Sequence, residues 1–130
     1  MSHIVTGKVG VRYTDRNLLI RALSPHGNIY ENESLYEVGN GLTRSKYQLV
    51  LVAKENNQFR IGYNLVEGTW KQFQENYGSV GAWTQRVTER VQDRYLAFGY
   101  EKQLISEGFE VTVTETKDGS FEVVALEEMY

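Results

Sequence analysis

Cysteine is absent from the sequence, and histidine occurs only twice, as His3 and His26. Without cysteine the chain can form no disulfide, thiolate nucleophile or cysteine metal site, and this usage suits a reducing compartment. Neither histidine has a second one at a spacing that would close a metal site, which needs at least three converging ligands. We therefore expect a cytoplasmic protein with no bound metal and no cofactor.

A long apolar run is also missing, because no stretch approaches the roughly 20 residues of a membrane-crossing helix. The segment from Met1 to Tyr13 mixes polar and charged residues among short apolar steps, unlike a signal peptide. The formal net charge of −3 offers no general attraction to nucleic-acid phosphates or anionic lipids. We expect neither a membrane nor nucleic acid as a partner.

The length and composition are those of one small globular domain. A chain of 130 residues has room for a single hydrophobic core, so we predict one domain over residues 1–130. Apolar residues make up 41% and charged residues 24%, which is ordinary globular usage. The domain is therefore expected to fold on its own.

The spacing of apolar residues predicts six strands and two helices. A two-residue period is typical of half-buried strands, and a period of three to four residues is typical of helices. Pro25 ends the first helix, and Gly99 marks a candidate kink in the second. The expected strands are 5–13, 29–38, 47–53, 59–65, 109–114 and 121–125, and the expected helices are 15–23 and 80–106.

The order of these elements is β-α-β-β-β-α-β-β, without the regular alternation that builds parallel sheets. We therefore predict an α+β fold in which both helices pack on an antiparallel sheet. Asp118-Gly119 is typical of a two-residue type I′ turn in the last hairpin. Gly39 to Gly41 is expected to be a turn, because no lysine-serine pair follows it at the spacing of a phosphate-binding loop.

Several short motifs resemble a known family. They are the start Met1 to Ile4, the helix Asp15 to Leu23, IGYN at 61–64, Arg94-Tyr95, Gly108 to Val111 and Asp118 to Ser120. Their order is similar to that of the hypothetical chloroplast reading frame thirty-five family, domain of unknown function twelve fifty-seven, of algal plastids, cyanobacteria, other bacteria and some bacteriophages. The chain departs from the family in ending with Glu127 to Tyr130 rather than tryptophan, and in its loop from Gly39 to Lys46. The resemblance implies a small intracellular protein and assigns no activity.

Catalytic side-chain sets are not evident in the sequence. The serines are scattered, and none lies in a nucleophile-elbow motif or pairs with a lysine. Paired carboxylates remain an alternative, because acidic side chains are numerous and general acid and base work needs two of them. Solvated strand edges explain these acids more simply. The acids in question are Glu31, Glu33, Glu37, Glu127 and Glu128.

Aromatic residues are concentrated before and within the long helix. Trp70, Phe73 and Tyr77 lie in a segment expected to connect a strand to the helix, and Trp83 lies in the helix. Such rings serve cores, ligand walls and interfaces alike, and core packing is the favoured interpretation in a small domain.

The long helix also carries Arg86, Arg90 and Arg94 at four-residue spacing among acidic residues, which is typical of a solvated, ion-paired face. On a helical wheel with about 100° per residue, Val87, Val91, Phe98 and Ile105 follow Trp83 on one face, and Arg94 falls at the edge of that face. An arginine there requires a partner.

We predict that Arg94 and Arg90, walled by Trp83 and Tyr95, form a binding surface, to which Trp70 also belongs. The alternative is an internal ion pair between Arg94 and one of Glu31, Glu33 or Glu37.

The leading hypothesis for function is a noncatalytic binding or adaptor protein that acts through protein contacts, self-association included. The runner-up is a module that binds or sequesters a small ligand, a nucleotide or another anion, through arginine and aromatic side chains. An enzyme that uses paired carboxylates ranks third.

Overall fold

The computed structural model describes residues 4–127 and confirms the α+β class, with helices and strands in the predicted order. The helices are α1 (Arg16–Leu23), followed by the short 3-10 helix η1 (Ser24–His26), and α2 (Gly78–Ser106). The strands are β1 (Ile4–Thr6), β2 (Asn28–Glu37), β3 (Gly41–Val52), β4 (Arg60–Val66), β5 (Thr69–Glu75), β6 (Phe109–Glu115) and β7 (Phe121–Glu127).

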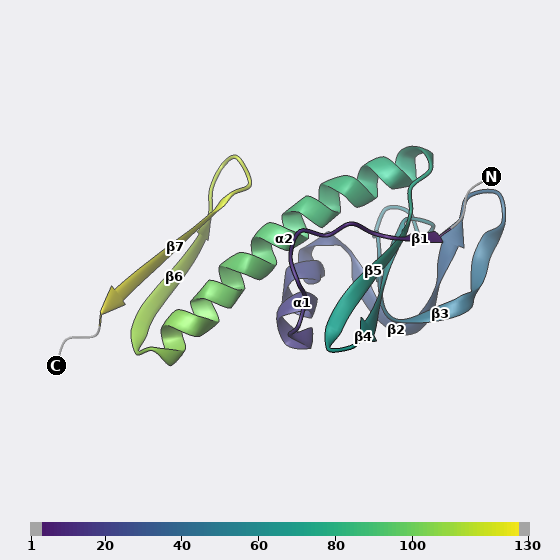
Figure 1. Cartoon of the computed structure of the whole chain (residues 1–130). Coiled ribbons are helices and arrows are strands. Elements are labelled where there is room, and N and C mark those ends of the chain that lie inside the picture. The colour runs from purple at the N-terminus through teal and green to yellow at the C-terminus, as the bar shows by residue number, and fades with distance from the viewer. Residues whose placement is uncertain (1–3, 128–130) are drawn as a thin grey trace.

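The strands form two separate antiparallel sheets (Figure 1). The larger sheet has the order β1-β5-β4-β3-β2, and among the described strands β6 pairs with β7 alone. β5 is an additional strand, because the segment expected to be a connection pairs with β4 on one side and β1 on the other. β1 is shorter than predicted, since residues 7–13 leave the sheet. Two backbone hydrogen bonds still join this segment to β5, from the Gly7 N–H to the Gln72 carbonyl and from the Trp70 N–H to the Tyr13 carbonyl.

The main core lies between the larger sheet and the two helices. Leu19, Ala22 and Leu23 of α1 are buried against the sheet, and Asp15 begins the helix by accepting a hydrogen bond from the Leu18 N–H at 3.1 Å. The buried residues of β3, β4 and β5 on this face are Leu49, Leu51, Ile61, Tyr63 and Trp70. Burial of such side chains contributes roughly 1.5–3 kcal/mol each, so this layer is the principal source of stability.

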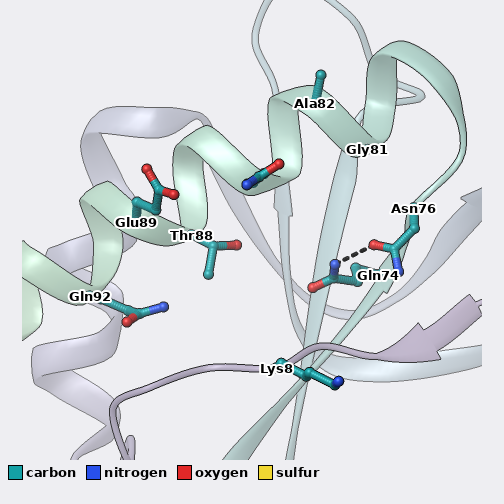
Figure 2. Close-up of a pocket in the computed structure, with 9 residues that line it drawn as sticks. Lys8, Gln74, Asn76, Gly81, Ala82, Thr88, Glu89 and Gln92 are labelled. Carbon is teal, nitrogen blue, oxygen red and sulfur yellow. Dashed lines mark hydrogen bonds between the residues drawn. The ribbon is translucent and has the colours of Figure 1, made fainter.

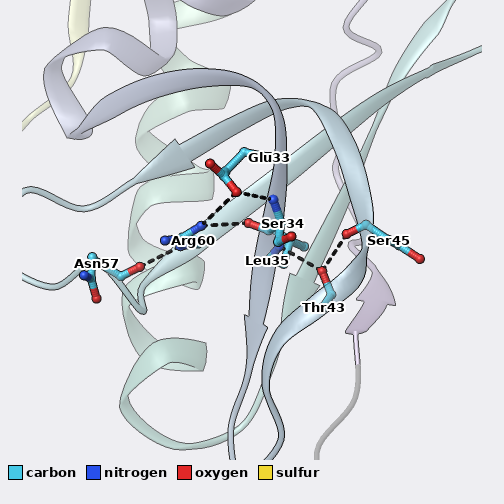
Figure 3. Close-up of polar contacts among 7 residues, drawn as sticks. All are labelled: Glu33, Ser34, Leu35, Thr43, Ser45, Asn57 and Arg60. Atoms are coloured by element: carbon cyan, nitrogen blue, oxygen red, sulfur yellow. Dashed lines mark hydrogen bonds and ion pairs between the residues drawn. The ribbon is translucent and has the colours of Figure 1, made fainter.

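The opposite face of the sheet holds a smaller apolar cluster of Leu35, Tyr47, Val50 and Val52, with Ile4 and Phe73 against it. A β-bulge between Ser34 and Tyr36 bends the sheet at this point. Figure 3 shows the polar contacts at the bend: the Thr43 hydroxyl accepts a hydrogen bond from the Leu35 N–H at 3.0 Å, and Arg60 Nη1 donates to the Ser34 carbonyl at 3.0 Å. These bonds replace ladder bonds that the bulge removes.

α2 is one continuous helix of 29 residues that runs through Gly99 without a break. Its first half covers the larger sheet and its second half carries the β6–β7 hairpin, which lies away from that sheet (Figure 1). Trp83, Val87, Val91 and Phe98 are buried as predicted, but Ile105 is 55% exposed because the helix has by then passed beyond the sheet. Among residues 4–127 no helix combines the length and the apolar composition needed to cross a membrane.

The turn between β6 and β7 is not the predicted type I′. That turn requires positive φ at both central residues, and Asp118 does not have it, whereas Gly119 has φ 86°. The Gly119 N–H donates to the Thr116 carbonyl at 3.1 Å, and the Thr116 N–H donates to the Ser120 carbonyl at 2.8 Å. The connection is therefore a three-residue loop with a glycine bulge, which needs left-handed backbone at one position only.

Candidate functional site

Three of the five predicted site residues lie in the main core. Trp70 and Trp83 are buried, and Trp83 packs against the Phe59 ring at 5.7 Å between centroids. Tyr95 is buried beside the Tyr13 ring, and its hydroxyl accepts hydrogen bonds from the Thr14 and Asp15 N–H groups at 2.9 and 3.0 Å. The structure therefore does not bring these rings to a surface with the arginines.

Arg94 is half-buried and binds the end of α1. Its Nε donates to the Ala22 carbonyl at 3.2 Å, and its Nη2 donates to the Arg21 carbonyl at 3.2 Å. The last carbonyls of a helix have no intrahelical donor and carry partial negative charge, so a guanidinium satisfies them in both respects. Burial lowers the pKa of Arg94 from its ordinary value, an effect that Glu115 opposes and Arg21 reinforces.

The alternative ion pair of Arg94 with an acid of β2 is wrong. Glu31 pairs with Arg16, Glu33 lies 3.8 Å from Arg60, and Glu37 accepts a hydrogen bond from Asn40. These acids do lie on an edge strand of the larger sheet, where Glu31 is exposed and Glu33 and Glu37 are half-buried. The partner of Arg94 is backbone rather than carboxylate.

Arg94 and Arg90 instead meet the β6–β7 hairpin. The Arg94 guanidinium lies over the rings of Phe98 and Phe121, 4.9 and 5.7 Å from their centroids. The Arg90 guanidinium lies so close to Gly119 that a Cβ there would come within 2.7 Å of Nη1. The two arginines therefore lie at the junction where α1, α2 and the hairpin converge.

A groove of about 590 Å³ lies between α2, the end of β5 and the segment after β1, and uncharged polar side chains dominate it (Figure 2). Gln85, Thr88 and Gln92 contribute from one face of α2, and Gln74 and Asn76 from β5 and the residue after it. Lys8 and Glu89 are the charged members of the lining, and they come from different elements.

A directional chain of hydrogen bonds fixes the amides of this groove. The buried Tyr63 hydroxyl donates to Gln72 Oε1 at 3.2 Å, and Gln72 Nε2 donates to Gln74 Oε1 at 2.7 Å and to Thr88 Oγ1 at 2.9 Å. Gln74 Nε2 then donates to Asn76 Oδ1. Each amide accepts at its oxygen and donates at its nitrogen, so the last member presents its NH₂ group as a donor at the groove.

Sequence reasoning missed this groove. A signal existed, because Gly81, Gln85, Thr88 and Gln92 recur at intervals of three and four residues and so share one helical face. The β5 side of the groove had no such signal, since the strand itself was not predicted.

A second, smaller groove of about 290 Å³ is more apolar and lies between the second half of α2 and β7. Leu96 and Tyr100, which are 45% and 59% exposed, form its α2 side, and Phe121 and Val123 form its β7 side. We call α2 from Leu96 onward, together with β6 and β7, the C-terminal arm.

Residues 4–127 contain no group of three histidine, aspartate or glutamate side chains that could hold a metal ion. Glu128, one of the acids considered for paired-carboxylate chemistry, lies outside the described residues. No protein-family model, curated protein or solved structure matches the chain. The fold and the grooves described above are therefore the basis for any functional assignment.

Proposed function

We propose that the chain is a noncatalytic binding or adaptor protein that acts through protein contacts, and that the C-terminal arm makes them. One observation carries this proposal: the β6–β7 hairpin has no fully buried side chain among its described residues, although its inner face is apolar. A two-stranded hairpin is marginally stable by itself and needs further strands or a helix packed on it. Here α2 packs on the hairpin but leaves the inner side chains Phe109, Val111 and Val123 only half-buried. A partner on the arm would supply what the hairpin lacks. We also propose that the protein is cytoplasmic and that it is related to the family that its motifs resemble.

Exposed apolar side chains on the arm support the same function. Val124 and Leu126 project from the outer face of β7, and Leu126 is 61% exposed. Leu96 and Tyr100 add exposed apolar surface in the neighbouring groove. Val124 and Leu126 are neighbours on one face of β7, and exposed apolar side chains that adjoin one another are typical of protein interaction sites.

A capture experiment with two matched variants tests the proposal. Tagged wild-type protein, Leu126→Glu and Leu65→Glu are used as baits, and bound proteins, including untagged copies of this chain, are identified by mass spectrometry. Leu65 is 48% exposed on β4, so it is a comparable leucine outside the arm. We expect Leu126→Glu to lose the partner and Leu65→Glu to retain it. Equal retention by both variants contradicts the assignment to the arm.

A second candidate function, binding of a small ligand, is favoured by the ordered amides of the larger groove. The groove has one cation, Lys8, and one carboxylate, Glu89, among amides and a hydroxyl. This balance suits a polar ligand without net charge better than the nucleotide or anion expected from sequence. Native mass spectrometry of the purified protein tests it: a retained small molecule should be lost in Asn76→Leu and kept in Asn17→Leu, an exposed site on α1.

A further inference from the structure

The outer edge of β7 is an open strand edge with a defined hydrogen-bonding pattern. Thr116 and Ser120 form a bonded pair next to the turn, and bonded and non-bonded pairs alternate along an antiparallel ladder. The pair of Thr112 with Val124 is therefore bonded, so the backbone groups of Val124 are used inside the hairpin. The N–H and C=O groups of the odd-numbered residues, Val123 and Ala125 among them, point outward, and within residues 4–127 no strand pairs with them.

β7 is complementary to a second copy of itself. If two antiparallel copies of β7 pair along all seven residues, 121–127, the two-fold axis passes through the middle residue, Val124. Val124 then lies opposite Val124 of the second copy, and Val123 lies opposite Ala125. In this register the outward groups of the odd-numbered residues form the bonded pairs. Glu122 falls opposite Leu126, and Glu127 falls opposite Phe121. Like charges, which destabilise a sheet when directly opposite, are thereby kept apart.

The apolar groove lies on the same side as this edge. Its lining comes from α2, β7 and the turn before β7, and includes no residue of β6. A two-fold axis through Val124 and perpendicular to the sheet places both α2 helices on one face of a four-stranded sheet. Leu96 and Tyr100 of one copy then face the same residues of the other copy, so pairing of the strands also covers the groove.

The β6 edge is less suited to the same contact. Its outer-face residues are Glu110, Thr112 and Thr114, whereas those of β7 are Glu122, Val124 and Leu126. Pairing at β6 would leave the groove open, because the groove is on the other side of the hairpin.

We propose that two copies of this chain associate through their β7 edges into a symmetric dimer with a continuous four-stranded sheet β6-β7-β7-β6. The proposal rests on the proposed function and names the partner of the C-terminal arm as a second copy of this chain. A strand from a different protein is the competing occupant of the same edge.

Single cysteines test the register directly, since the chain has none of its own. Val124→Cys places two thiols at the two-fold axis in a non-bonded pair, where Cα atoms lie about 4.5 Å apart, within the range that a disulfide spans. Thr112→Cys is the matched control, because it lies directly opposite Val124 on β6 and on the same exposed face. After mild oxidation with diamide, Val124→Cys should give a covalent dimer in high yield and Thr112→Cys should not.

Light scattering coupled to size exclusion should give twice the chain mass of 15.0 kDa for the wild type. Ala125→Pro deletes an outward N–H without touching the bonds inside the hairpin, and proline is tolerated at such edge positions. Two intermolecular hydrogen bonds are lost by symmetry, so we expect dimerisation to weaken by about tenfold or more. Circular dichroism verifies that each variant stays folded.

Three outcomes overturn the proposal. The first is a wild-type protein that is monomeric at millimolar concentration. The second is a covalent dimer of Thr112→Cys without one of Val124→Cys. A monomer that captures a different protein in a Leu126-dependent manner refutes the dimer while leaving the adaptor function standing.

Discussion

At the scale of single residues, Arg94 has the clearest structural role. Its guanidinium binds two carbonyls at the end of α1 and packs on Phe98 and Phe121. The helical wheel placed this arginine correctly at the edge of the buried face and inferred that it needed a partner. The sequence could not predict that backbone carbonyls are the partner of Arg94, because a pattern of side-chain types does not show where the carbonyls of a helix end lie.

Replacement of Arg94 by Met should destabilise the fold by about 1–2 kcal/mol, because it keeps the aliphatic stem but leaves two helix-end carbonyls without a charged donor. Thermal or urea unfolding measures the change. Arg86→Met, at an exposed position two turns earlier in α2, is the control and should change stability by less than about 0.5 kcal/mol. Loss of partner binding with unchanged stability would instead make Arg94 a contact residue.

His26 should make stability depend on pH. Burial lowers the pKa of His26 from its ordinary value of 6.5, with Arg94 and Arg90 adding to the effect and Glu115 opposing it. Its buried Nε2 has no hydrogen-bond partner within residues 4–127, so protonation places a charged N–H where none of these residues accepts it. The unfolded chain binds this proton more readily than the folded chain does, so its contribution to stability is present above pH 6.5 and is lost as the pH falls through the lower, folded pKa.

The free energy of unfolding measured between pH 7.5 and 5 should therefore fall more steeply for the wild type than for His26→Gln, which cannot titrate. Parallel profiles for the two proteins would show that His26 does not cause the dependence.

At the scale of elements, β5 explains what the apolar pattern could and could not predict. The strands that alternate or are continuously apolar were found, because their inward residues are hydrophobic. In β5 the inward-facing Gln72 is a buried amide held by Tyr63 and Thr88, so the expected period is broken by a polar residue. The groove was missed for the same reason, since its β5 side depends on that strand.

The loop before β7 offers a test of backbone conformation. Gly119 has φ 86°, where a β-branched side chain is strained, whereas asparagine tolerates this region. Gly119→Val should therefore destabilise the hairpin by about 1–3 kcal/mol, and Gly119→Asn should destabilise it much less. Thermal unfolding compares the two. The Arg90 contact will not decide the result, because the nearest atom is the end of a flexible side chain. Equal melting temperatures for the two variants would contradict the assigned loop.

At the scale of the whole molecule, the chain has a well-packed body and a lightly packed arm. The body combines the larger sheet, α1 and the first half of α2 around fully buried residues such as Leu51, Ile61 and Val91. Composition and length predicted a core sufficient for folding. They could not show that α2 extends past the larger sheet and carries a second sheet. The alternation of apolar and polar residues is the same in a strand that faces a deep core and in a strand that faces a single helix.

Hydrogen exchange followed residue by residue should separate these two parts. Local opening costs little where few side chains are buried, so amides of β6 and β7 should exchange much faster than those of Leu51 or Ile61 in dilute solution. If β7 edges pair, raising the protein concentration should slow exchange at Val123 and Ala125, whose N–H groups point outward. Val111 on β6, outward on the opposite edge by the same alternation, is the internal control and should stay fast. Equal slowing at Val111 and Val123 would point to general stabilisation of the hairpin, and no slowing at either would leave the β7 edge unpaired.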